Sequence, residues 1–291
     1  MGKRRNNLTK RGLWYGLLAV LILLVIINFS TLSYVASMAA DQISLVLKST
    51  DIRALAGDDA VSSAIQDQLA LVPSVMEFGN QMGFPETEAY STYIPLDRDV
   101  FLYSLSASRK DAFEDYQWWW PFIGSLPYKG FIEKKDALHE QLELQQQGYD
   151  THLGEATAMS TLGLLPDPIL TTMMNETDAT VLVNTIYHER THQLFYKKNE
   201  VVFNENAAVL LGSLTTLAFV KEQFGEHSIE YQRQVDRISD LRLFSEFIDQ
   251  FYQELDQLYL SAIPSEEKVR QRQDIFQENI QEFQSIKGKL A

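Results

Sequence analysis

The stretch "TIYHERTHQLFYKKNEVVFNENAAVLLG", Thr185–Gly212, contains two histidines four residues apart, with a glutamate directly after the first. Residues at i and i+4 of an α-helix share a face, so His188 and His192 would turn both imidazoles toward the same point. Glu189 follows His188 and would reach the edge of an ion bound there. This H-E-x-x-H pattern is typical of sites in which the histidines bind zinc and the glutamate acts as a general base.

The residues before the motif help to decide between a metal site and an ordinary helix. A polar helix with two solvent-facing histidines could match the pattern by chance. However, "VLVNTIYH", Val181–His188, is strongly apolar, which predicts that this helix is buried. Buried polar side chains need a partner or a ligand, so the context favours a metal ion.

The residues after the motif bear on the third ligand. The metzincin extension needs a glycine and a third histidine where this chain has Phe195 and Lys198, so that class is excluded. "FNENAA" places Glu205 in the first turn of the next helix, with Asn204 as its N-cap. An antiparallel helix pair would bring Glu205 back over the histidines. The alternative is a carboxylate that favours a helix N-terminus through the helix dipole. Glu200, in the turn, is a competing ligand.

The apolar pattern of the rest of the chain predicts an α+β fold. Helical spacing predicts helices at 41–84 (with a break near 57–59), 177–197 and 204–224, a long helix from 228 and a last one from 264. A polar helix at 133–147 should end at Gly148. Alternating or aromatic segments predict short strands within 99–108, 116–132 and 149–163. This order indicates a small mixed or antiparallel sheet, then the motif helix, the glutamate-bearing helix and a helical hairpin at 228–291.

The N-terminus predicts a membrane anchor. Five bases and no acid lie in residues 1–11, and no charged residue follows until Asp41. Residues 13–35 are long enough to span a bilayer, with a basic cytoplasmic tail at 1–12 and an extracytoplasmic body at 36–291. The alternative is a cleaved signal peptide, because "ASMAA" offers small residues for cleavage, but the apolar run is long for one. We expect a single-pass protein of the bacterial inner membrane, or a periplasmic protein if the segment is cleaved.

Cysteine content and charge exclude several classes of function. The chain has no cysteine, so disulfides, thiolate zinc sites and cysteine nucleophiles are excluded. Beyond the basic tail, 20 bases stand against 39 acids, a net charge of −19. Phosphates would repel such an acidic body, so nucleic acid is not a predicted partner.

The motif and its surroundings resemble a bacterial family described as "putative aminopeptidases", metallopeptidases of the HExxH zincin type. The pattern H-E-x-x-H-Q followed by F-N-E-x-x-A carries the resemblance. "YIPLDRDVFLYSLSAS", "WWWPFIGSLPYKGFIEKKDA" and "GYDTHLGEATAMSTLGLLPDPIL" follow in the family's order, and the likeness covers about 33–220. It implies a zincin-like fold and one Zn²⁺ ion. The implied zinc ligands are His188, His192 and Glu205, and the implied general base is Glu189.

The chain departs from this family in three places. Family members typically have Leu-Ala inside the motif, where this chain has Arg190 and Thr191. Many carry a lipid-attachment cysteine near the N-terminus, which a protein anchor would replace here. Family members often have two cysteines in the aromatic segment, and this chain has Trp119 and Ser125 at the equivalent positions. The loss of both together fits a disulfide that the fold does not require. None of these differences removes a proposed ligand.

Two places are candidates for contact with a substrate. Zincins commonly hold a peptide along an edge strand before the motif helix, and chain order and resemblance point to His152–Gly163. A structural strand and turn is an equal alternative for this segment. Its candidate contacts are Ser160, Thr161, Leu162 and Gly163. Tyr128 is a candidate hydrogen-bond donor to the oxyanion of the reaction.

Together these inferences predict a membrane-anchored, exported zinc metallopeptidase that acts on peptides. Two histidines and one carboxylate leave a fourth zinc position for water, whose proton the glutamate would take. The aminopeptidase assignment rests on the resemblance alone. The alternative is a non-catalytic envelope protein with structural zinc, in which the C-terminal helices bind a protein partner.

Overall fold

The computed structural model describes residues 34, 43–44, 47–55, 58, 61–120, 124–158, 166–198 and 200–290. The chain divides into two compact units, 1–49 and 50–291, and the elements described below belong to the second. The predicted tail at 1–12 lies outside the described residues, as does the predicted membrane span at 13–35 apart from Tyr34.

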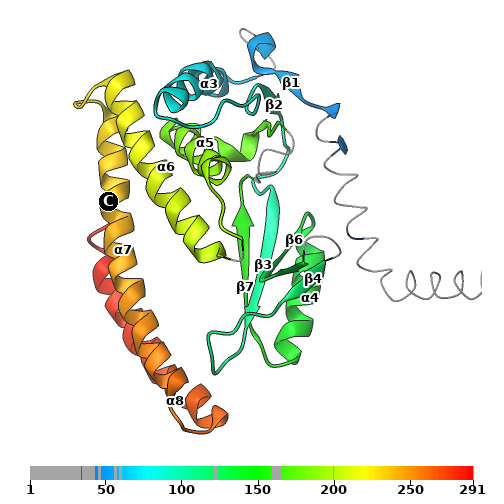
Figure 1. The fold of residues 1–291 in the computed structure, drawn as a ribbon, viewed down its shortest axis with the longest axis vertical. Coiled ribbons are helices and arrows are strands. Elements are labelled where there is room, and N and C mark those ends of the chain that lie inside the picture. The colour runs from blue at the N-terminus through cyan, green and yellow to red at the C-terminus, as the bar shows by residue number, and fades with distance from the viewer. Residues whose placement is uncertain are drawn as a thin grey trace, which may run out of the picture. The chain divides into compact units, whose positions relative to one another are not determined.

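The second unit combines helices with small sheets, which confirms the predicted α+β class (Figure 1). Its strands are β1 (Thr50–Asp51), β2 (Thr92–Ile94), β3 (Leu102–Ser108), β4 (Trp118–Trp120), β5 (Gly124–Leu126), β6 (Tyr128–Phe131), β7 (Asp150–Ala156) and β8 (Ile169–Leu170). One sheet has the order β1-β2-β8 and is mixed, because β2 and β8 are parallel. Another has the order β6-β3-β7 and is antiparallel, and β4 and β5 form a two-stranded antiparallel sheet. The described residues therefore form three small sheets where one was predicted.

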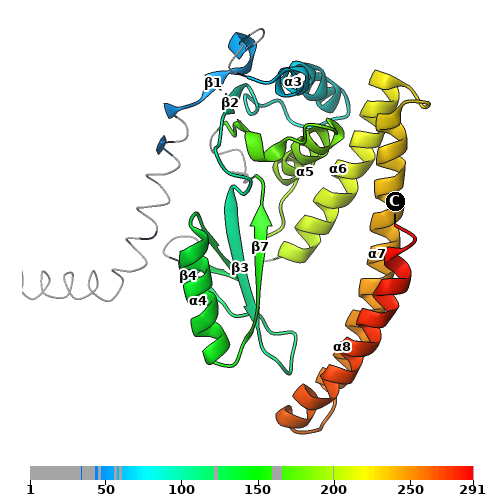
Figure 2. The ribbon, with the colours of Figure 1, turned by 180° about the vertical axis from the view of Figure 1, so that it is seen from behind.

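Helices surround these sheets. They are α3 (Ser63–Gln81), α4 (Lys134–Gln146), α5 (Thr180–Leu194), α6 (Val201–Phe224), α7 (Ile229–Leu260) and α8 (Ser265–Lys287). α4 packs against the strands of the antiparallel sheet (Figure 2). α5 contacts α3 and α6, α6 contacts α7, and α8 runs back along α7 (Figure 1). The predicted long C-terminal helices are present, and Gly148 follows α4 with a φ of +93°, a conformation that favours glycine.

Buried aromatic rings hold α3, α5 and α6 together. Phe78 of α3 packs edge-on against Phe219 of α6, with 5.6 Å between the ring centroids. Tyr187 of α5 is fully buried, and its hydroxyl donates a hydrogen bond to the carbonyl of Val75 at 2.8 Å. The motif helix is therefore buried, as the apolar residues before the motif predict.

α6 has an unusual composition for a helix that bears a metal-ligand candidate. Within the described residues, it is the one helix long and apolar enough to cross a membrane. It nevertheless packs against α5 and α7 (Figure 1). One third of its apolar window is buried, so its inner face packs within the second unit while several apolar side chains remain exposed.

β7 lies at an edge of the antiparallel sheet. In the described part of the chain it pairs with β3 alone, from Leu102 opposite Ala156 to Ser108 opposite Asp150. Residues 150–156 of the segment predicted as a strand within 149–163 therefore form an edge strand. This strand precedes the motif helix in the chain.

The helix predicted at 41–84 is partly wrong. Thr50–Asp51 pair with β2, and residues 52–55 form a 3-10 helix. Residues 43, 44 and 47 are helical, as predicted, and α3 begins at Ser63, where the side chain of Ser62 accepts the N–H of Ile65. β1, β2 and β8 were missed because two or three residues cannot show an alternating pattern.

The ends of α5 and α6 also differ from the prediction. α5 is shorter at both ends, and α6 begins at Val201 and not at residue 204. Asn204 is therefore not an N-cap, and Glu205 lies in the second turn. The buried amide of Asn204 donates to the carbonyl of Lys197 at 2.8 Å and accepts from its N–H at 2.9 Å. Two bonds to the loop backbone replace the single bond that an N-cap would make.

Candidate metal centre

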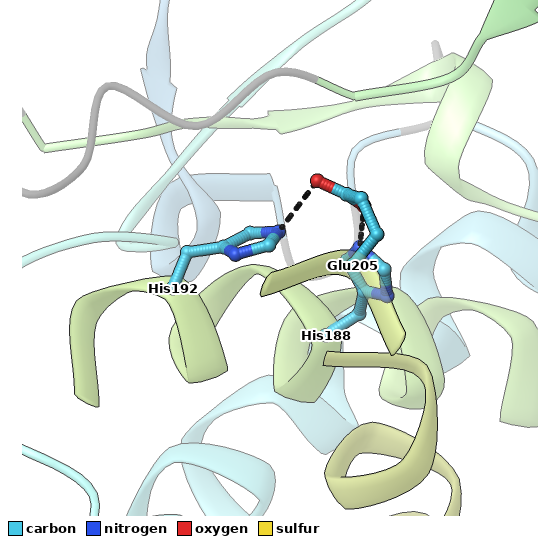
Figure 3. A group of neighbouring side chains, drawn as sticks. All are labelled: His188, His192 and Glu205. Atoms are coloured by element: carbon cyan, nitrogen blue, oxygen red, sulfur yellow. Dashed lines mark ion pairs between the residues drawn. The ribbon is translucent and has the colours of Figure 1, made fainter. Parts of the chain in front are cut away.

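His188, His192 and Glu205 come together at the start of α6. The two histidines project from successive turns of α5, and the carboxylate reaches over them from α6 (Figure 3). Glu205 Oε2 lies 3.3 Å from His188 Nε2, and Glu205 Oε1 lies 3.6 Å from His192 Nε2. One ligand atom of each residue lies within 4.8 Å of the others, so the three could hold a metal ion.

The spacing of these atoms fits a small divalent ion. Zinc takes nitrogen and oxygen ligands at about 2.0–2.1 Å, so tetrahedral geometry separates neighbouring ligand atoms by roughly 3.3 Å. The two nitrogen–oxygen distances of 3.3 and 3.6 Å are close to that value. Imidazole and carboxylate ligands suit zinc and also other first-row metals, so the donor set does not select one ion.

The three side chains alter one another's protonation. The pKa of Glu205 is lowered, chiefly because it accepts a hydrogen bond from His188. Burial acts against the charged form of both histidines. It lowers the pKa of His192, whereas the hydrogen bond to Glu205 and the charges of Glu189 and Glu205 raise the pKa of His188. An anionic Glu205 beside a neutral His192 supplies two of the protonation states that metal binding requires.

Glu189 has the properties of a proton acceptor near neutral pH. Burial raises its pKa to about 7; the charge of His188 opposes this, and those of Glu205 and Asp167 add to it. A general base works best when its pKa lies near the working pH. The carboxyl is therefore suited to take a proton from a water held beside it.

The predicted substrate contacts are only partly within the described residues. Ser160, Thr161, Leu162 and Gly163 lie outside them. Tyr128 begins β6 and is partly exposed. Its pKa is raised by burial first and then by the charges of Tyr196 and Glu205.

The family model described as "Putative aminopeptidase" matches residues 33–290. The chain belongs to this family. Comparison with curated proteins and with solved structures gave no match. Membership of the putative aminopeptidase family indicates a peptidase-like function, and the matched range also includes both C-terminal helices.

Arg190 departs from the putative aminopeptidase pattern, and the sequence did not predict where its side chain lies. It is fully buried, and its guanidinium donates to the carbonyls of Met76 and Pro85 and to Asn80 Oδ1. Its carbon Cζ also lies 5.2 Å from the centroid of the Phe84 ring. The side chain thus joins the motif helix to the end of α3. The sequence signals were its departure from the family pattern and a long charged side chain next to Glu189 in a helix expected to be buried.

Tyr90 is a second residue that sequence reasoning missed. It is buried, with a φ of +63°, the one positive φ of a non-glycine in the described residues. Its N–H donates to the carbonyl of Asp167 at 2.6 Å, and its hydroxyl has no hydrogen-bond partner among the residues that the structure describes. Strained residues gather at functional sites, but nothing in the letters around Tyr90 distinguishes it from a loop tyrosine.

Proposed function

We propose that the protein is a zincin-type metallopeptidase in which His188, His192 and Glu205 bind one Zn²⁺ ion and Glu189 is the general base. The observation that carries the proposal is the approach of the Glu205 carboxylate to both imidazoles, within 3.3 and 3.6 Å. Family membership supports hydrolysis of peptides as the reaction.

A zinc ion in this position would act as a Lewis acid toward the scissile carbonyl and lower the pKa of a water toward neutrality. Glu189 takes the proton of the attacking water and then gives it to the departing amine. Its raised pKa suits both transfers, because the protonated and ionised carboxyl differ little in free energy near pH 7. Tyr128 is the proposed hydrogen-bond donor to the carbonyl oxygen as it gains charge.

The number of protein ligands favours catalysis over a structural role for the metal. Structural zinc sites are closed by four protein ligands, whereas catalytic sites keep one position for water or substrate. In the part of the chain that the structure describes, the candidate metal-binding group has three residues, which is the number expected of a catalytic site.

The surroundings of Glu205 suit a peptide substrate. Val202 and Val209 precede and follow it by three and four residues, so they lie on the same side of α6. Their side chains are 75% and 37% exposed, and substrate side chains near the scissile bond would contact them. The free side of β7 and the segment Ser160–Gly163 remain the proposed place for the peptide backbone.

The proposal includes an exported location. The basic residues at 1–11 and the uncharged run that follows them support an anchor at 13–35 with the body outside the cytoplasm. A signal peptide that is cleaved would give the same exported body.

The test uses the full-length chain, loaded with zinc, and a peptide library with free and blocked N-termini. Glu189→Gln should keep its zinc and lose about 10²–10⁴-fold in cleavage rate, because general-base catalysis contributes that much. The same change at exposed Glu282, on α8, is the matched control and should leave cleavage unchanged.

Two results would count against the proposal. Cleavage by Glu189→Gln at the wild-type rate would exclude this carboxyl as the base. A wild-type protein that binds zinc tightly but cleaves no peptide would support the structural alternative instead. Cleavage of only the free N-termini would identify an aminopeptidase, and cleavage of both sets would identify an endopeptidase.

A further inference from the structure

Gly212 lies where α6 approaches the backbone of the motif helix. A Cβ atom at this position would be 3.0 Å from the amide nitrogen of His188, 3.2 Å from its Cα and 3.4 Å from its Cβ. Two of these three atoms are backbone atoms, so they cannot turn away as the end of a flexible side chain could. Glycine in a helix interior costs up to about 1 kcal/mol relative to alanine. At this position it allows a helix contact that a side chain would prevent.

Gly212 and Glu205 lie on the same side of α6. They are seven residues apart, almost two full turns of an α-helix, so both face α5. Ala208, between them, is fully buried and also small. A shift of α6 away from His188 at Gly212 would therefore also move the Glu205 carboxylate away from the imidazoles.

α6 is held on either side of Gly212, which limits how it could yield. Toward its start, the amide of Asn204 makes two bonds to the backbone of Lys197. One turn after Gly212, the hydroxyl of Thr216 donates to the Gly212 carbonyl at 2.8 Å and lies 3.5 Å from Asn184 Oδ1 on α5. Because α6 is held at Asn204 and at Thr216, an added methyl group at residue 212 must push α5 and α6 apart between these two contacts.

We propose that Gly212 is a positioning residue that sets the reach of Glu205, and so makes the carboxylate a metal ligand together with the two histidines. The inference rests on the proposed function only in taking the three residues as a metal site. It adds that the third ligand depends on a helix contact two turns away, at a residue that touches neither metal nor substrate.

The test measures zinc binding by the full-length chain in competition with a chromophoric chelator. Gly212→Ala should lower zinc affinity by about 10–100-fold, the usual cost of disturbing a residue that orients a ligand. Gly288→Ala is the matched control, because a Cβ there meets no atom of the described residues within 4 Å and the glycine has a φ of −72°. It should bind zinc as the wild type does.

The double variant separates positioning from a general loss of structure. If Gly212 acts through the carboxylate, Gly212→Ala should cause little further loss in a Glu205→Gln background. Wild-type affinity in Gly212→Ala, or losses that add fully in the double variant, would overturn the proposal. Wild-type protein that binds no zinc would instead overturn the proposed function.

A third variant keeps the test decisive if Gly212→Ala does not fold. Glu205→Asp withdraws the carboxylate by one methylene at an exposed position, and leaves the contact between α5 and α6 in place. A loss of zinc affinity of about tenfold or more is expected, because drawing the ligand back should cost at least as much as losing a residue that orients it. Unchanged affinity would show that the reach of residue 205 does not matter, which overturns the proposal.

Discussion

The carboxyl of Glu189 couples the stability of the metal-free protein to pH. Its pKa is raised by burial to about 7 from an ordinary value of 4.5. The folded chain therefore keeps a proton that the unfolded chain releases between these two values. The contribution of Glu189 to folding stability should fall as pH rises through this window and should change no further above it.

Glu189→Gln removes this contribution, because glutamine has no proton to lose. As pH rises from 5 to 8, the free energy of unfolding of the metal-free variant should therefore increase relative to that of the wild type. Urea denaturation at several pH values measures it, with Glu282→Gln as the exposed control. A difference between wild type and Glu189→Gln that does not change with pH would contradict the raised pKa.

At the scale of residues, the sequence predicted the three side chains that form the candidate metal-binding group, but not the residues that support them. His188 and His192 follow from helical spacing, and Glu205 from the helix pair. Asn204 was misassigned because its amide bonds to a loop whose path the letters do not show. Tyr90 is notable for its positive φ, and Gly212 for its close approach to the backbone of His188. Neither property can be predicted from the sequence without knowledge of the fold.

Arg190 and Gly79 form the contact by which α3 fixes α5. A Cβ on Gly79 would lie 2.3 Å from Arg190 Nη1 and 3.1 Å from Tyr187 Cε1. Gly79→Ala should therefore destabilise the protein by about 1–2 kcal/mol, since the clash outweighs the better helix propensity of alanine. Arg190→Met should cost about 2–4 kcal/mol, because it leaves buried acceptors without a donor.

The double variant tests whether this is one contact. With methionine at 190 the space beside Gly79 no longer holds a guanidinium, so Gly79→Ala should cost at least about 1 kcal/mol less than it does alone. Chemical denaturation of the four proteins gives this coupling energy. Fully additive losses would mean that Arg190 does not occupy this space in solution.

At the scale of elements, long periodic segments were predicted well and short paired ones were not. α6, α7 and α8 follow from apolar spacing over many turns. β2 and β8 are three and two residues long and pair in parallel across more than seventy positions. No local pattern encodes that pairing, because it depends on where the intervening sheet and helix place the two strands.

The C-terminal helices are joined to the antiparallel sheet by a small polar contact. Arg272 of α8 is buried, and its guanidinium pairs with Asp150 at the start of β7 and donates to the carbonyl of Lys110 at 2.8 Å. Beside it, the ring of Phe113 stacks on Tyr252 of α7 at a centroid distance of 4.5 Å. These residues connect parts of the chain that lie far apart in sequence.

Arg272→Met should lower the free energy of unfolding by about 1–3 kcal/mol, a moderate loss because Asp150 is half exposed and can be hydrated. Amide hydrogen exchange should increase in α8 and at the 109–116 loop more than in α5. Arg242→Met on α7 removes an exposed pair with Glu246 and serves as the control, with little expected change. Equal exchange in Arg272→Met and the wild type would contradict a holding role for this contact.

The position of Glu205 on α6 has a consequence for the lifetime of the protein. α6 also joins α5 to α7, where Gln234 donates to the carbonyl of Ser213 at 2.9 Å. A metal ion bound between α5 and α6 would therefore add its binding free energy to the central helix contact of the fold. At a free metal concentration a thousand times the dissociation constant this is about 4 kcal/mol, much of the net stability of an ordinary domain. Metal supply would then govern how long the chain resists proteolysis.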